Sequence, residues 1–356
     1  MSSNVLEMII NDQTAGEVWW EKNPDGASRI VMAQRIKGDE SPEEICKLLK
    51  AEWELAVERA KNPATDKWLD AYQIYRTDTL EEISLVLAQK KIALPPLPKE
   101  IIKFIGKVRE EAGVVWNSGG FTTTGKLWLQ LTWENSRIDL GNGDIAEKRL
   151  LIYYDYKSRK GRIKLCVGNV VCENTLIFSL SETGRSVDID FGSLSDSCLD
   201  EIKSKFGLME TKYTQTLETF QTLQTREVDL RNGAEISTFA VIMDDRNLLD
   251  KILYKQAEKE EQIQIVSDLL SAHSQARTME MSKVGADILK CIIGGVGQDI
   301  RGDNWYSAVQ GVTNYVDHFA SRTPDTRVES AYFGRGVEMK AEALQIASLL
   351  AASQLH

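Results

Sequence analysis

The residues best suited to chemistry lie in one short basic segment, residues 148–164. The segment carries seven basic residues and one acidic residue, Asp155, in a chain whose formal net charge is −10. The run 157–161 has the composition of a tight turn, because its glycine can adopt backbone conformations that other residues avoid. The segment is therefore predicted to form a hairpin. So many cations need acidic neighbours or an anionic partner to offset their mutual repulsion.

The expected pairing of this hairpin puts aromatic and basic side chains on one face. A five-residue loop sets Tyr156 opposite Arg162, and Tyr154 opposite Lys164. Aromatic rings can stack on bases while cations pair with phosphates, and single-strand binding needs both. A loop that differs by one residue would instead set Asp155 opposite Arg162. The other face is predicted to join the core through Leu151, Tyr153, Ile163, Leu165 and Val167.

The preceding strand adds a further aromatic residue to a polar face. In residues 126–133 the leucines share one face, whereas Trp128 shares the other with polar side chains. A structural interpretation stays open, because charges keep an edge hairpin soluble and tyrosines favour strands. The functional interpretation predicts a nucleic-acid-binding surface made of Trp128, Tyr154, Tyr156, Lys157, Arg159, Lys160, Arg162 and Lys164.

Outside this segment, the residues that could do chemistry form no recognisable constellation. The five cysteines are scattered and the three histidines are too few to suggest a zinc site. The glycine-rich run 293–299 matches neither the Walker pattern nor the dinucleotide-binding pattern, so a helix end is expected there. We therefore predict no catalytic residue, no metal ligand and no cofactor. An enzyme acting on nucleotides stays open through Asp188, Asp190, Asp317 or His318.

Composition narrows the class of protein. A pI near 5.1 argues against a protein that coats nucleic acid with its whole surface, although a local basic face remains compatible with it. No stretch reaches the roughly 18 apolar residues of a membrane-spanning helix. The first residues lack the basic-then-apolar pattern of a secretory signal. We expect a cytoplasmic protein with reduced cysteines and no membrane partner.

The elements that must position the basic hairpin suggest an α+β fold. Short strands are expected in residues 1–40, followed by helices over about 41–61, 79–91 and 98–111. Residues 112–191 are rich in β-branched and aromatic residues and predict an antiparallel β-meander, and helices dominate from about 194. We expect the meander to pack with this C-terminal helical array, beside a small N-terminal α/β module. The expected domains are 1–111, 112–225 and 226–356.

The last helix suggests self-association. Residues 338–350 carry apolar side chains over a wide arc of the predicted helix. A helix of this kind is normally covered by other elements, from the same chain or from another copy. We expect a homo-oligomer.

Three motifs in the second half of the chain resemble a known family. Residues 170–176 carry a valine-cysteine-x-asparagine-threonine-leucine pattern. Residues 305–318, and residues 330–336 followed by Lys340, resemble two further stretches of the same family. This is the phage and plasmid-like family catalogued as domain of unknown function 932, and the resemblance covers about 112–356. A family strand that often ends in histidine and threonine is replaced here by residues 187–191. The resemblance implies a phage or mobile-element origin and an intracellular location, and it supplies no activity.

The expected function is that of a phage- or plasmid-type nucleic-acid-associated protein. It would bind single strands and assist replication or recombination without catalysis. A meander followed by a long helix also suits a ring-forming strand-annealing protein, by analogy of fold. The alternatives are an enzyme acting on nucleotides, and an assembly or host-inhibition protein that binds no ligand.

Overall fold

The computed structural model describes most of the chain, including the basic hairpin. The expected turn at 23–26, most of the 170–176 motif and Asp190 lie outside the described residues. The described residues are 18–22, 28–36, 38–80, 82–87, 94–122, 125–141, 143–169, 175–178, 187–189, 191, 194–204, 206–231, 233–254, 258–275, 281–295, 297–320 and 329–354.

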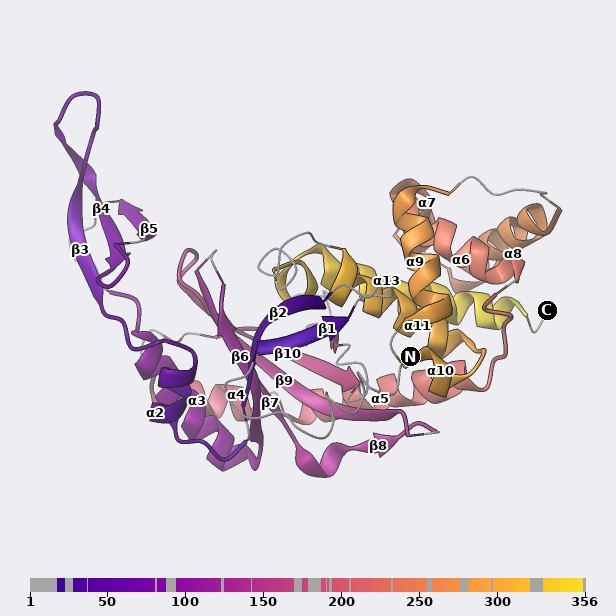
Figure 1. The fold of residues 1–356 in the computed structure, drawn as a ribbon, viewed down its shortest axis with the longest axis horizontal. Coiled ribbons are helices and arrows are strands. Elements are labelled where there is room, and N and C mark those ends of the chain that lie inside the picture. The colour runs from indigo at the N-terminus through magenta and orange to yellow at the C-terminus, as the bar shows by residue number, and fades with distance from the viewer. Residues whose placement is uncertain are drawn as a thin grey trace.

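One large antiparallel sheet forms the centre of the molecule (Figure 1). Its strands follow the order β1-β2-β6-β7-β9-β10-β11, with β8 beside β9 and β12 beside β10. The predicted meander, and with it the α+β class, is confirmed. The N-terminal strands extend this sheet, because β2 pairs with β6. The strands are β1 (Val18–Lys22), β2 (Ser28–Arg35), β6 (Val115–Phe121), β7 (Lys126–Thr132), β8 (Ile138–Asp139), β9 (Ile145–Asp155), β10 (Lys160–Asn169), β11 (Thr175–Phe178) and β12 (Val187–Ile189).

The C-terminal part is the predicted helical array. Two segments within it, η2 and η3, are π-helical turns. The elements of the array are α4 (Asp196–Ser204), α5 (Phe206–Gln224), α6 (Ala234–Asp244), α7 (Arg246–Leu253), α8 (Lys259–Gln275), α9 (Lys283–Gly294), α10 (Gln298–Arg301), α11 (Trp305–Asn314), η2 (Tyr315–Phe319), η3 (Glu329–Phe333) and α13 (Arg335–Ser353), whereas the short helix η1 (Glu134–Ser136) lies between β7 and β8.

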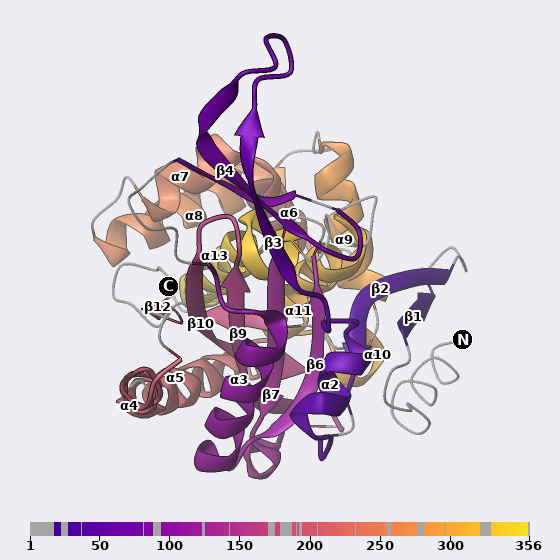
Figure 2. The ribbon, with the colours of Figure 1, turned by 90° about the vertical axis from the view of Figure 1, so that its left-hand side faces the viewer.

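Helices cover both faces of the central sheet. Figure 2 shows α2 (Pro42–Leu48) and α3 (Pro98–Ala112) in front of the strands, with α11 and α13 behind them. On the first face, Phe104 of α3 and Tyr154 of β9 both pack against Phe191, with ring centroids 5.7 and 6.0 Å apart. On the second face, Tyr153 packs against Phe333 of η3, with ring centroids 4.6 Å apart. A sheet covered in this way buries side chains of both strand faces.

A second, three-stranded sheet projects from the body of the molecule as an arm (Figure 1). Its strands are β3 (Leu55–Lys61), β4 (Trp68–Arg76) and β5 (Glu82–Leu87), in the order β3-β4-β5. The root of the arm is fixed to the central sheet, because the ring of Trp53 lies 5.3 Å from Phe121 and 5.6 Å from Tyr156.

The arm corrects two predicted helices. The helix expected over 41–61 begins as predicted, with a Ser41–Glu44 capping box and Pro42 in the first turn. It ends at Leu48, however, and Lys50 takes a left-handed conformation with φ of 51° before β3 begins. The helix expected over 79–91 is wrong, because residues 82–87 form strand β5, which pairs with β4. The alternating, partly β-branched sequence of this stretch favours a strand.

The last helix is covered by its own chain. In α13, Ala343, Ile346, Ala347 and Leu350 are buried, and the helix packs against α5, α6, α8 and α11. Its wide apolar arc is therefore explained within one copy and gives no reason for self-association.

Candidate nucleic-acid interface

The basic hairpin forms as β9 and β10, but its predicted pairing is wrong. Asp155 pairs with Lys160, so the turn is the four residues between them. Asp155 Oδ1 accepts hydrogen bonds from the backbone N–H groups of Lys157 at 3.0 Å and Ser158 at 3.3 Å. Arg159, not the glycine, takes the left-handed conformation, with φ of 57°. The aspartate thus closes a tighter turn than residue composition suggested.

The new register puts Tyr154 on the opposite face of the sheet from Arg162 and Lys164. Tyr154 pairs with Gly161, while Arg162 pairs with Tyr153 and Lys164 with Leu151. Paired residues point to the same side of a sheet, so Tyr154 faces the core with the glycine. The glycine is needed there, because a Cβ atom at Gly161 would lie 1.5 Å from Phe191 Cδ2.

Three aromatic residues of the predicted surface are buried. Trp128 is 1% exposed, Tyr154 is 3% exposed and Tyr156 is 0% exposed. Tyr156 Oη donates a hydrogen bond to the carbonyl oxygen of Pro96 at 3.1 Å. Burial raises the pKa of Tyr156 well above its usual value. None of the three presents a ring face on which a base could stack.

The polar face of β7 and β10 is an internal layer. The ring of Trp128 packs edge-on against Tyr332, with centroids 5.1 Å apart. Its Nε1 atom is buried without a hydrogen-bond partner among the described residues. Lys164 Nζ donates to the carbonyl oxygen of the same Tyr332 at 2.9 Å. The π-helical turn η3 therefore lies over the face that was expected to be open.

Charges in this layer are matched by acids far away in the sequence. Lys126 Nζ lies 2.8 Å from Glu329, and Lys340 Nζ lies 2.7 Å from Asp317. Lys164 has no carboxylate partner among the ion pairs of the described residues. Burial lowers the pKa of Lys164 to about 8, and the cations of Arg162, Lys340 and Lys126 act in the same direction.

The tip of the hairpin remains at the surface. Lys157 and Lys160 are exposed, and Arg159 and Arg162 are half-buried. These four cations, called the tip cations below, lie within six consecutive residues. They are the part of the predicted surface that is accessible to a large anionic partner.

The family of the chain follows from the comparison with known proteins. The family described as domain of unknown function (DUF932) matches residues 97–335, which is more than half of the chain. The chain belongs to this family. No curated protein and no solved structure matches it. The resemblance expected from the sequence is confirmed, although the match begins earlier than residue 112 and ends at the start of α13.

The DUF932 match begins just before α3 and includes the basic hairpin. The arm precedes it. Trp68, near the end of the arm, is 57% exposed, and Lys61 Nζ lies 4.6 Å from the centroid of its ring. On the same face Arg59 pairs with Tyr72. Exposed aromatic and basic side chains therefore do share one face of a hairpin, but this hairpin is the arm and not β9–β10. The alternation of side chains in residues 68–76 is a signal that could have predicted strand β4. The sequence analysis instead predicted helices on both sides of it and no strand.

Two of the residues considered for an enzyme acting on nucleotides, Asp317 and His318, are buried in the described part of the chain. Asp317 is paired with Lys340, and His318 is buried beside it. No group of three or more His, Cys, Asp or Glu side chains among the described residues could hold a metal ion. Cys46 and Cys166 are buried thiols, and burial raises their pKa values to about 11 and 12. The described part of the chain contains no helix suited to crossing a membrane.

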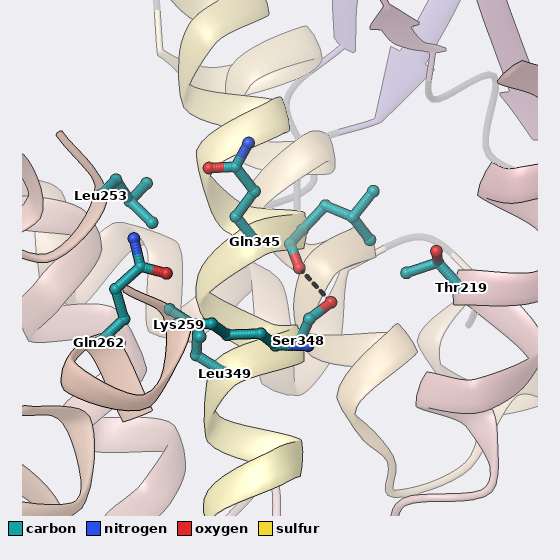
Figure 3. Close-up of a pocket in the computed structure, with 8 residues that line it drawn as sticks. Thr219, Leu253, Lys259, Gln262, Gln345, Ser348 and Leu349 are labelled. Carbon is teal, nitrogen blue, oxygen red and sulfur yellow. Dashed lines mark hydrogen bonds between the residues drawn. The ribbon is translucent and has the colours of Figure 1, made fainter. Parts of the chain in front are cut away.

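A pocket lies between α5, α7, α8 and α13 (Figure 3). Helices α7 and α8 lie at the opposite end of the molecule from the arm (Figure 1). Its volume is about 390 Å³. The lining is apolar in part and carries one cation, amides and hydroxyls: Thr219, Leu253, Lys259, Gln262, Leu344, Gln345, Ser348 and Leu349. Ser348 Oγ donates to the carbonyl oxygen of Leu344 at 2.8 Å.

Proposed function

We propose that this chain is a nucleic-acid-associated protein that contacts phosphates with the tip cations. The observation that carries the proposal is the concentration of Lys157, Arg159, Lys160 and Arg162 at the tip of one hairpin of a chain with net charge −10. Cations held close together on an exposed turn repel one another, and a polyanion relieves that repulsion. The turn is also well defined, because Asp155 holds its backbone.

The tip cations support binding that depends on charge and not on base sequence. Each phosphate contact releases counterions, so affinity falls steeply with salt concentration. Base stacking is not available on this hairpin, because its tyrosines lie in the core. We propose single strands as the ligand, in replication or recombination of a phage or plasmid, in accord with the resemblance of the sequence. Ionic contacts alone do not distinguish single from double strands, so both forms belong in the test.

The test is oligonucleotide binding measured over a series of salt concentrations. The variant combines Lys157→Ala, Arg159→Asn and Lys160→Ala; asparagine is chosen because it tolerates the left-handed backbone of position 159. The loss of three contacts should weaken binding and flatten the salt slope by about 2, since each phosphate contact on a single strand contributes about 0.7. The experiment uses a single strand and a duplex of the same sequence.

The matched control removes three exposed lysines elsewhere, through Lys107→Ala, Lys251→Ala and Lys283→Ala. It changes net charge by the same amount and should bind with nearly the parent's salt slope. Equal weakening by both triple variants would show a general charge effect and contradict the proposal. Absence of binding by the parent at low salt would do the same.

A further inference from the structure

We propose that the ring of Phe333 stacks on a base and that Arg335 contacts a neighbouring phosphate, so that the surface at the hairpin tip selects single strands. This inference rests on the proposed function and names the form of nucleic acid that the same surface binds. The tip cations can contact any polyanion. A stacking ring, in contrast, requires a base that is not enclosed in a duplex.

The register of the hairpin turns its cations toward the face against which η3 packs. Lys126 pairs with Asp155, which in turn pairs with Lys160, so these three side chains form one row across β7, β9 and β10. Arg162 follows Lys160 by two residues and therefore lies on the same face. The cations thus continue from the turn toward η3.

The last residue of η3 places an aromatic ring among these cations. Phe333 is half-buried, and its ring packs on Tyr153 with centroids 4.6 Å apart. Lys126 Nζ lies 5.6 Å from the centroid of the Phe333 ring, and Lys164 Nζ lies 5.9 Å from it. Arg162 Nη1 donates to the hydroxyl of the same Tyr153 at 3.5 Å. The part of the ring that reaches solvent is therefore surrounded by cations, as in surfaces that bind single strands.

The combination of ring and cations comes from two segments that are distant in the sequence. The hairpin supplies the cations, while its own Tyr154 and Tyr156 are buried in the core. Residues 330–336 supply the ring, and they are one of the motifs that carry the family resemblance. This motif has no part in the contact between the tip cations and phosphates, and stacking by Phe333 gives it one.

The chain continues from the ring to a further cation at the surface. Arg335 begins α13 and is exposed, as is Gly334 before it. A guanidinium is suited to a phosphate, because it can donate two parallel hydrogen bonds to two of the phosphate oxygens. Arg335 follows Phe333 by two residues, so a base and a phosphate of one strand can be contacted together.

Cations outnumber acids over this surface even when every described acid of the region is counted. The cations are the four tip cations, Lys126 and Arg335, and the acids are Asp155, Asp188, Glu329 and Glu338. Two of these acids have local roles: Asp155 accepts backbone hydrogen bonds in the turn, and Glu329 pairs with Lys126. The excess of cations favours an anionic ligand.

The experiment compares the affinity of the full chain for a single strand and for a duplex of the same sequence. The parent should prefer the single strand. Phe333→Leu keeps an apolar side chain against Tyr153 but removes the ring, so it should weaken single-strand binding by about tenfold, the loss of one stacked base. Duplex affinity and the salt slope should remain those of the parent, because stacking is not ionic. Phe333→Tyr keeps a ring and should bind like the parent.

The matched control makes the same change at another half-buried phenylalanine. Phe206 packs edge-on against Trp133, with ring centroids 5.9 Å apart, and Phe206→Leu should leave both affinities unchanged. Equal affinity of the parent for both ligands overturns the inference, and so does equal loss of both affinities in Phe333→Leu. The proposed function stands in either case, because charge alone would then hold the nucleic acid. A parent that binds neither ligand at low salt overturns the proposed function and this inference together.

Arg335→Ala tests the phosphate contact at an exposed position, where the change leaves the fold intact. It should weaken single-strand binding and reduce the salt slope by about 0.7, the contribution of one phosphate contact. Arg231→Ala removes the same charge from another exposed position and should keep the parent's slope. The same slope in both arginine variants overturns the assignment of Arg335.

Discussion

The β9–β10 hairpin and the arm contain similar residues but differ in what covers them. Both combine strand aromatics with lysines and arginines. In β9–β10 the helix α3 covers one face and the turn η3 covers the other, so Tyr154 and Lys164 are internal. In the arm, Trp68 and Lys61 remain at the surface. Surface chemistry is therefore decided by packing partners, which here come from distant parts of the chain.

Charge density in the sequence proved a poor guide to exposure. In the more basic of the two hairpins, Lys148 and Lys164 are buried. The Lys164 amine meets a carbonyl oxygen 168 residues away, and Lys126 of the neighbouring strand β7 meets Glu329, which is 203 residues away. A run of cations in a strand is compatible with burial when another element brings acceptors to it.

The largest expected effect contrasts the tryptophans of the two regions. Trp128→Ala should lower the free energy of unfolding by about 3–5 kcal/mol, because it removes a large buried ring that packs against Tyr332. Trp68→Ala should change it by less than about 0.5 kcal/mol, because its ring is largely exposed. Chemical denaturation of both variants measures the difference. Similar losses of stability would contradict the contrast between the covered hairpin and the exposed arm.

The next effect concerns the register of β9–β10. Gly161→Ala should destabilise the protein by about 1–3 kcal/mol, because the new methyl group meets the ring of Phe191. Gly125→Ala provides a comparison at a glycine of the neighbouring turn, where φ is 88° and the nearest atom is 3.9 Å away. That change strains the backbone without a steric clash. Combining each change with Phe191→Ala separates them, since only the Gly161→Ala cost should shrink.

A smaller effect comes from the buried amine of Lys164. Its folded pKa of about 8 lies below the usual 10.5, so between these values the unfolded chain binds more protons at this group. The contribution of Lys164 to stability should therefore rise as the pH increases from 8 to 10.5. Lys164→Met should remove this rise. It should also stabilise the protein at pH 7, by at most about 1 kcal/mol for each unit by which the pKa of Lys164 is lowered. Parent and variant unfolding curves with the same pH slope would contradict the burial of a charged amine.

The smallest effect leaves stability unchanged and reports only on exposure. The chain has eight tryptophans, and among those whose side chains the structure describes Trp68 is the one with high exposure. Trp68→Phe should remove the fluorescence component that acrylamide or iodide quenches most readily. Trp128→Phe should leave that component in place. Retention of the readily quenched component in Trp68→Phe would contradict the assignment of that component to the exposed Trp68.

Much of the architecture could be predicted from local patterns. The capping box at Ser41 and Glu44, the α3 stripe and the meander all depend on neighbouring residues, and each is present. The arm was missed because strands β3 and β5 lie within residues 41–61 and 79–91, which were predicted as helices. Strand formation there depends on pairing with β4, which is a contact between segments and not a property of either one.

The sequence by itself determined the α+β class, the family and the location of a basic hairpin near residue 160. Only the tertiary structure decided which side chains of that hairpin reach solvent. A register that differs by an odd number of residues exchanges the two faces of a strand, and Asp155 selects that register through two backbone hydrogen bonds. The second face was then closed by η3, which follows more than 160 residues later. Period-two patterns assign residues to faces, but the energy that buries a face comes from whatever element packs upon it.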